Sequence, residues 1–336
     1  MKYQELLNIN RLNFENKKVL VIGGGWMGKQ YCTALRMMGV KDISVITRSE
    51  ETAKDCREKF KCNALPGGYL KNLPLLSDRF DLVIIAVPIH ELISATVGAI
   101  NVGYYNILVE KPGALYSSVL EKVKSEIPKN VRVRIAYNRV VYPTLWKLID
   151  ILSSGEEITS CFYTFTEWIH TINFNNNKPE VYQRWGISNS LHVISMAHFL
   201  IGMPKQISVY RNGGLEWHPT SSCFTGAGIT EKGIPFSYHA DWKSAGRWGI
   251  DIMTDQDGYR LMPLEKLYYC KKKSVEWEEI PVNSAYSDCK MGVAEEIAIM
   301  LYPELENLFP LITLEQGIKF IKLAEAIFGY YSRPSK

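Results

Sequence analysis

A run of glycines between an apolar strand and a helix constrains this chain more than any other feature. Residues 17–23 (KKVLVIG) are short, apolar and ended by glycine, which is typical of a buried parallel strand. Gly23, Gly25 and Gly28 then fit G-x-G-x-x-G and open a segment with helical apolar spacing. In that context the glycines allow a tight turn, close approach of a pyrophosphate and close helix packing. The motif therefore predicts a dinucleotide site, and a purely structural turn is the alternative.

Strand-like and helix-like segments alternate through the first part of the chain, up to residue 138. The expected strands after the first are 42–47, 80–88, 105–110 and 131–138, and the expected helices are 26–39, 49–60, 90–100 and 113–127. Ser49 is a suitable N-cap for the second of these helices. Such alternation with short links predicts an α/β Rossmann fold, a doubly wound parallel sheet, over residues 1–138.

The alternation of strands and helices ends after residue 138, and strand-like segments predominate. They are 160–169, 205–211, 235–242, 247–254, 259–269 and 274–282. A helix at about 186–201 interrupts them, and a last helix begins where Thr313 and Gln316 can form a capping box. Residues 139–336 are therefore expected to form an α+β second domain on an open, mostly antiparallel sheet.

Composition excludes several classes of protein. The chain has 336 residues, 46% of them hydrophobic, and a formal charge of only +4, so a nucleic-acid partner is not expected. No apolar run reaches the ~18–20 residues of a membrane helix, and the N-terminus lacks the apolar segment of a signal peptide. The seven cysteines form no C-x-x-C, and no H-x-x-x-H or H-E-x-x-H spacing occurs. A reduced cytoplasmic protein without a bound metal is expected.

The end of the second strand bears on which dinucleotide binds. NAD enzymes usually place an acid there for the ribose 2′-hydroxyl, whereas this chain has Thr47, Arg48 and Ser49. A guanidinium with two hydroxyls suits a 2′-phosphate, so NADP is favoured over NAD. Glu50 and Glu51 could serve the ribose instead, but they fit better as acids of a first helical turn.

A second signature is LVEKPGAL at 108–115, in which Glu110-Lys111-Pro112 stands between a strand and a helix. It resembles the E-K-P motif of the Gfo/Idh/MocA oxidoreductases, the glucose–fructose oxidoreductase and inositol dehydrogenase family. The likeness extends over nearly the whole chain through AVP (86–88), AYNRVVYP (136–143) and NSLHVISMAHFLIG (189–202).

The resemblance implies that Lys111 and His192 are the catalytic residues, with a cis peptide bond before Pro112. Lys111 also ends a parallel strand at the carboxyl edge, where an ammonium could polarise a carbonyl or stabilise an alkoxide. The imidazole, with an ordinary pKa near ~6.5, suits proton exchange. Ser188 and Ser195 stand where many members carry acids or Asn, which leaves open whether Lys111, with Tyr137 or Tyr163, carries more of the proton transfer.

The same comparison and the strand ends give the expected binding residues. Cofactor contacts are expected at Gly23, Gly25, Trp26, Met27, Gly28, Thr47, Arg48, Ser49, Val87, Pro88, Glu110, Lys111 and Asn138. Substrate contacts are expected at Lys111, Tyr137, Glu167, Arg184, Asn189 and His192. Weaker candidates are Arg139, His170, His239, Asp241 and Arg247. His170 and Glu167 would point to opposite faces of one regular strand, and Glu167 is preferred.

Together these features predict an NAD(P)-dependent oxidoreductase that moves hydride to or from a sugar, sugar phosphate or nucleotide sugar. A hydrolase or lyase that retains its NAD, and a non-catalytic cofactor-sensing regulator, are the alternatives. The resemblance also implies a homodimer or homotetramer built through the second-domain sheet.

Overall fold

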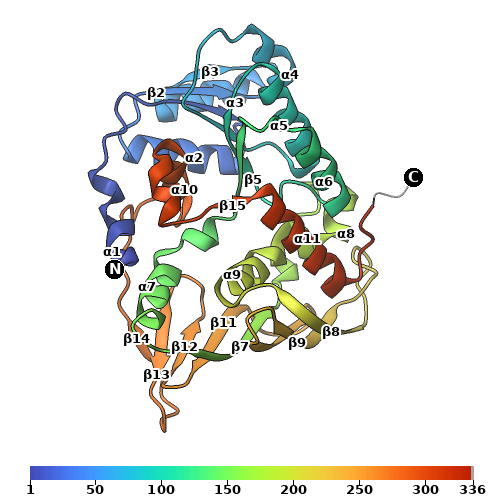
Figure 1. Cartoon of the computed structure of the whole chain (residues 1–336). Helices are drawn as coiled ribbons and strands as arrows, with labels where there is room; N and C mark the ends of the chain where they lie inside the picture. The colour runs from blue at the N-terminus through green and yellow to red at the C-terminus, as the bar shows by residue number, and fades with distance from the viewer. Residues whose placement is uncertain (334–336) are drawn as a thin grey trace. The chain divides into compact units, whose positions relative to one another are not determined.

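The computed structural model describes residues 1–333, which form two compact units (Figure 1). The parallel-sheet unit contains residues 5–141 and 284–318. The antiparallel-sheet unit contains residues 1–4, 142–283 and 319–333. The predicted fold class, a Rossmann-type sheet followed by a mostly antiparallel sheet, is confirmed.

The sheet of the first unit has the strand order β15-β6-β5-β4-β1-β2-β3. Its strands are β1 (Lys18–Ile22), β2 (Asp42–Ile46), β3 (Asn63–Leu65), β4 (Leu82–Ile85), β5 (Asn106–Glu110), β6 (Arg132–Ala136) and β15 (Ile312–Thr313). All neighbours pair in parallel except β15, which runs antiparallel to β6. Every residue of β4 is buried, as expected for a strand covered on both faces.

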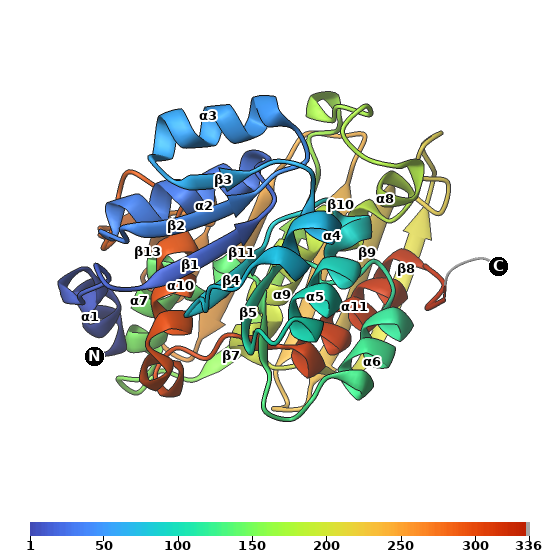
Figure 2. The same cartoon turned by 90° about the horizontal axis from the view of Figure 1, so that it is seen from above.

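Helices connect these strands. They are α1 (Lys2–Leu7), α2 (Trp26–Met37), α3 (Glu50–Phe60), α4 (Tyr69–Asn72), α5 (Leu92–Asn101), α6 (Ser117–Glu126) and α10 (Val293–Leu301). The Ser49 hydroxyl accepts a hydrogen bond from the Thr52 N–H at 3.2 Å, which confirms the predicted N-cap of α3. Helix α10 packs against α2, and the two lie side by side in both views (Figures 1 and 2).

The second sheet has the order β14-β13-β12-β11-β7-β10-β9-β8. Its strands are β7 (Ile158–Phe165), β8 (Pro204–Asn212), β9 (Cys223–Thr230), β10 (Pro235–Asp241), β11 (Trp248–Thr254), β12 (Gly258–Leu261), β13 (Leu267–Cys270) and β14 (Glu278–Ile280). Only β7 and β10 pair in parallel. The remaining helices are α7 (Pro143–Leu152), α8 (Pro179–Gln183), α9 (Leu191–Ile201) and α11 (Leu314–Phe328), and α9 lies against β7 and β11 (Figure 1).

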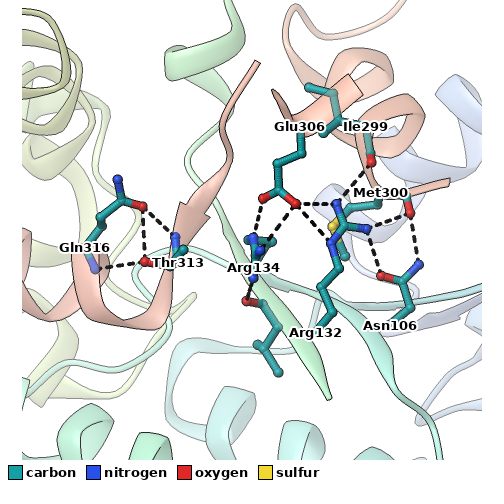
Figure 3. A network of polar contacts seen from close by, with 9 residues as sticks. Asn106, Arg132, Arg134, Ile299, Met300, Glu306, Thr313 and Gln316 are labelled. Atoms are coloured by element: carbon teal, nitrogen blue, oxygen red, sulfur yellow. Dashed lines mark hydrogen bonds and ion pairs between the residues drawn. The ribbon is translucent and has the colours of Figure 1, made fainter. Parts of the chain in front are cut away.

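The units differ from the two consecutive domains that the sequence predicted. Residues 284–318 belong with the parallel sheet and not with the second domain. Figure 3 shows one reason: Arg132 on β6 donates to the carbonyl oxygens of Ile299 and Met300 at the end of α10, at 3.1 and 2.9 Å. Arg132 and Arg134 also share the carboxylate of Glu306, and these charges lower its pKa although burial opposes them.

The start of α11 agrees with the sequence, and one predicted strand does not. Gln316 Oε1 accepts from the Thr313 N–H at 3.0 Å, and the Gln316 N–H donates to Thr313 Oγ1 at 3.2 Å, so the capping box is confirmed (Figure 3). The predicted strand 259–269 is two strands, β12 and β13, which pair as an antiparallel hairpin. Pro263 lies in the turn between them, where a missing N–H costs the sheet no hydrogen bond.

Candidate functional site

The glycine turn has the geometry that the motif predicts. Gly23 has φ +115°, and a side chain there would lie 2.3 Å from the Ala86 carbonyl oxygen. A side chain at Gly28 would lie 1.8 Å from the Gly23 carbonyl oxygen. At Gly25, the N-cap of α2, it would meet no protein atom within 4 Å. Gly23 and Gly28 are therefore needed for the turn itself, whereas the space beside Gly25 is a cradle that a diphosphate would fit.

Three residues that were expected at the adenosine end follow β2. Thr47 is 2% exposed, and its hydroxyl donates to the Ser49 carbonyl oxygen at 2.9 Å. Ser49 caps α3, so both hydroxyls serve the local turn. Arg48 between them is exposed, and no partner for its guanidinium is found among the residues that the structure describes. Arg48 is thus the group best placed to meet a phosphate from solvent.

Val87 and Pro88 follow β4 and are partly exposed. Trp26 and Met27 form the first residues of α2; Trp26 is 65% exposed and Met27 partly exposed. They lie at the ends of neighbouring parallel strands, since β4 pairs with β1. The carboxyl edge of an open α/β sheet is where its ligands bind.

Lys111 and Glu110 end β5 at the same edge. Lys111 is partly exposed and precedes Pro112 through a cis peptide bond, as the resemblance implied. Glu110 is buried, and its Oε1 accepts a hydrogen bond from the Tyr31 hydroxyl at 2.6 Å. Burial raises the pKa of Glu110, while the charges of Lys111 and Lys290 oppose that rise. The Glu110 carboxyl thus points into the unit.

A second carboxyl group, Glu296 on α10, lies close to Glu110 in the same interior. It is fully buried, and neither of its oxygens has a hydrogen-bond partner among residues 1–333. Burial and the nearby Glu110 raise the pKa of Glu296 well above its ordinary value. An ionised carboxylate in such a place would cost several kcal/mol, so these surroundings favour the neutral form of Glu296. No sequence pattern pointed to this residue.

The polar side chains that follow β6 form hydrogen bonds within the parallel-sheet unit. The Asn138 side-chain amide donates to the Met291 carbonyl oxygen at 2.8 Å and accepts from Arg139 at 3.0 Å. Tyr137 is fully buried, and burial raises its pKa. The predicted cofactor contact of Asn138 and substrate contact of Tyr137 stay predictions.

In the antiparallel-sheet unit, His192 lies in the first turn of α9 and is 5% exposed. Its ring centre is 5.8 Å from that of Trp248. A π-helical turn, Gly186–Ser190, leads into α9 and carries two groups that contact Glu167. Asn189 and Ser190 donate to the two carboxylate oxygens of Glu167 at 2.8 and 2.6 Å. Glu167 thus fixes the turn that precedes His192.

Glu167 and His170 were expected on one strand, but β7 ends at Phe165 and both lie beyond it. Beyond the strand end, Thr166 Oγ1 accepts from the Asp241 N–H, and the Trp168 indole donates to the Gly246 carbonyl oxygen. Glu167 is 3% exposed and His170 is exposed. The preference for Glu167 as a substrate contact stays a prediction, since its carboxylate already accepts bonds within the unit.

Arg184 also has partners within its unit. Its guanidinium pairs with Glu325 at 2.9 Å, donates to the Tyr331 carbonyl oxygen at 2.8 Å and lies over the Tyr330 ring. Its expected substrate contact stays a prediction. Tyr163 is fully buried, and its hydroxyl lies 3.2 Å from His198 Nε2 in the core beneath α9.

The two serines near His192 also bond to main-chain groups. Ser195 donates to the His192 carbonyl oxygen at 3.2 Å, and Ser188 donates to the Trp185 carbonyl oxygen at 3.3 Å.

Arg247, a weaker candidate from the sequence, contacts two aromatic rings and a buried carboxylate. Its guanidinium carbon lies 4.6 Å from the ring centre of Trp168 and 4.3 Å from that of Trp248, between the two indoles. One nitrogen is 3.7 Å from Glu167 Oε2, and the side chain is 35% exposed. His239 is exposed and Asp241 partly exposed. Arg247 therefore links the Glu167 carboxylate to a partly exposed aromatic surface.

No group of three His, Cys, Asp or Glu side chains suited to a metal ion occurs among residues 1–333. None of the helices in that range has both the length and the apolar character required to cross a bilayer.

Comparisons with known proteins support the fold. The family model for shikimate / quinate 5-dehydrogenase matches residues 5–99. No curated protein matches the chain significantly. UDP-N-acetylglucosamine 3-dehydrogenase GnnA from Acidithiobacillus ferrooxidans is similar in structure, with a TM-score of 0.71 and 14% identity over 94% of this chain and 98% of that one.

Two further solved structures have the same architecture. A levoglucosan dehydrogenase in complex with NADH and levoglucosan gives a TM-score of 0.72 and 16% identity over 93% of this chain and 96% of that one. Biliverdin reductase from Synechocystis sp. PCC 6803, in complex with biliverdin and NADP+, gives a TM-score of 0.70 and 14% identity over 93% of this chain and 99% of that one. At these identities the likeness establishes a shared two-unit fold.

Proposed function

We propose that this chain is an NAD(P)-dependent oxidoreductase of the Gfo/Idh/MocA type. The observation that carries the proposal is the Gly23–Gly28 turn, whose Gly25 leaves a cradle open at the N-terminus of α2, at the same sheet edge as Lys111. A dinucleotide would be held there by backbone N–H groups and the positive end of the helix. When bound, the nicotinamide would donate or accept the hydride.

The chain's own residues would handle the proton and the substrate oxygen. Lys111 would donate a hydrogen bond to that oxygen and stabilise negative charge as it develops. His192 would be the general acid/base that gives the proton to the substrate oxygen or takes it away, held in place by α9 and the Glu167-bonded turn. The exposed Arg48 favours NADP over NAD, because its guanidinium can pair with a 2′-phosphate.

We propose a sugar, sugar phosphate or nucleotide sugar as the substrate. The partly exposed Arg247 and the 49% exposed Trp168 support this choice, because an aromatic face suits a sugar ring and a guanidinium suits phosphate or hydroxyl oxygens. Two structurally similar proteins, GnnA and levoglucosan dehydrogenase, carry sugar derivatives in their names. Biliverdin reductase shows that this fold also occurs in a protein with a very different ligand.

The direct test follows the near-ultraviolet absorbance of the reduced nicotinamide with each cofactor and a panel of sugars, sugar phosphates and nucleotide sugars. We expect turnover with at least one of them, faster with NADP(H) than with NAD(H). Tight cofactor binding without turnover across the panel would argue against a sugar oxidoreductase. A cofactor that survives purification and is never consumed would favour a non-redox reaction with retained NAD.

A further inference from the structure

A lysine far along the chain stands over the first turn of α2. Lys290 Nζ lies 4.6 Å from the ring centre of Trp26 and 3.4 Å from Met27 Sδ. Trp26 and Met27 directly follow Gly25 and begin the helix. An ammonium group from the segment 284–292 is thereby placed beside the cradle that the glycine turn forms, although 263 positions separate Lys290 from Met27.

The backbone around Lys290 is fixed at the sheet edge. Asn138, which follows β6, donates from its side chain to the Met291 carbonyl oxygen at 2.8 Å. Gly292 has φ +84°, and a side chain there would lie 2.2 Å from the Asn138 carbonyl oxygen. The Lys290 carbonyl oxygen accepts from the Val293 N–H at 3.1 Å, at the start of α10. The backbone of Lys290 is therefore held by the residue that follows β6 and by the start of α10, and Lys290 is not the tip of a loose loop.

The charges around the cradle favour an anion. Lys290 lies close enough to the buried Glu110 and Glu296 to oppose the rise of both pKa values, as Lys111 does for Glu110 and Arg139 for Glu296. Burial, without a hydrogen-bond partner for either oxygen, raises the pKa of Glu296 despite these charges and so favours its neutral form. Lys111 and Lys290 thus bring two positive charges to this edge of the unit.

We infer that Lys290 is a cofactor-binding residue whose ammonium pairs with the diphosphate of a dinucleotide seated on the N-terminus of α2. This inference rests on the proposed function. The backbone N–H groups of the turn supply uncharged donors, and Lys290 supplies the charge that a diphosphate requires. The Trp26 ring supports the ammonium through a cation–π contact.

The test compares Lys290→Met and Lys290→Arg with the wild type in three titrations, monitored by calorimetry. The ligands are NADPH, ADP-ribose, which keeps the diphosphate, and 2′-AMP, which lacks it. Lys17→Met is the matched control, because Lys17 also lies over an aromatic ring (Tyr302, 4.7 Å) but precedes β1 at the opposite sheet edge. We expect Lys290→Met to weaken the binding of NADPH and ADP-ribose about 10-fold or more and to leave the affinity for 2′-AMP unchanged.

Lys290→Arg should retain most of the affinity, and Lys17→Met should bind like the wild type. An unchanged NADPH affinity in Lys290→Met would overturn the inference. So would an equal loss for 2′-AMP, since that would indicate a disturbed fold and not a lost phosphate contact. Lys290→Gln, which keeps a polar side chain of similar length, replaces the Met variant if that variant does not fold. If the wild type binds none of the three ligands, the proposed function itself is contradicted.

Discussion

Lys111 is the residue whose loss we expect to affect turnover most. In Lys111→Ala, kcat should fall by at least ~10²-fold, because the lost charge interacts most strongly in the transition state. The dissociation constant of NADPH should change little, since the Gly25 cradle and Arg48 lie at other strand ends. Steady-state kinetics measure the change in kcat, and a binding titration measures the dissociation constant of NADPH. An alanine variant with full turnover would exclude Lys111 from the chemistry.

His192→Ala tests a different role. If the imidazole is the general acid/base, kcat should fall by ~10²–10⁴-fold and one limb of the pH–rate profile should disappear. His192 is only 5% exposed and contacts Trp248, so a packing role is the competing explanation. A packing role would lower the melting temperature and raise KM while kcat and the pH profile stayed as in the wild type.

Arg48 should decide between the two cofactors. Arg48→Ala removes a charge-assisted contact worth about 1.5–3 kcal/mol, which corresponds to roughly 10- to 150-fold in the dissociation constant of NADPH. NADH has no 2′-phosphate, so its affinity should stay the same. Titrating both cofactors against both proteins measures the difference. An equal loss for NADH would mean that Arg48 does not contact the 2′-phosphate.

Residues with local roles could be predicted from the sequence. The close approach of Gly28 to Gly23 and the Ser49 cap involve residues only a few positions apart, so their patterns were sufficient. Arg184 depends on Glu325, which is 141 positions away, and a lone arginine gives no sign of such a partner. Lys290 and Glu296 could not be predicted for the same reason. Lys290 is distinguished by its contact with the Trp26 ring and Glu296 by its burial, and both depend on the fold.

At the scale of elements, alternation of strands and helices was enough to predict both sheets but not their boundaries. The short strand β15 has only two residues, Ile312 and Thr313, and leaves no periodic signal. Helix α10 is buried on every side, so it has no amphipathic pattern to reveal the sheet that it covers. Assigning residues 284–318 to the parallel sheet therefore required the contacts with β6 and α2.

Helix α10 should also make stability depend on pH. Burial raises the pKa of Glu295 to about 7, whereas an unfolded Glu titrates near ~4.3. Folding therefore favours the protonated form, and the contribution is fully present below about pH 4.3 and is lost as pH rises through about 7. The free energy of unfolding should fall by a few kcal/mol over this window from this residue.

Glu295→Gln keeps the shape of the side chain without a charge, so its stability should vary less with pH than that of the wild type. Urea titrations at about pH 5 and about pH 8 give the comparison, and the exposed Glu304→Gln serves as the control. If Glu295→Gln and the wild type lose stability equally between the two conditions, the buried Glu295 is not the source.

At the scale of the whole molecule, the open face of the second sheet bears on assembly. Side chains of β9 and β10 alternate between buried and exposed, and α9 covers the buried face through β7 and β11. On the other face, Phe162, Tyr210 and Ile229 are 42%, 66% and 39% exposed. The strand registers place all three on that face. A face with large apolar side chains is a candidate interface between copies of the chain.

We therefore predict a homodimer or homotetramer that buries this face. Size-exclusion chromatography with light scattering at micromolar concentration should give two or four times the mass of one chain. Phe162→Glu should shift the mass toward one chain, because an unpaired charge in an apolar interface costs several kcal/mol. Leu75→Glu, at a 73% exposed position of the other unit, should leave the mass unchanged. A wild-type monomer would contradict the prediction, and an oligomer that tolerates Phe162→Glu would move the interface to another face.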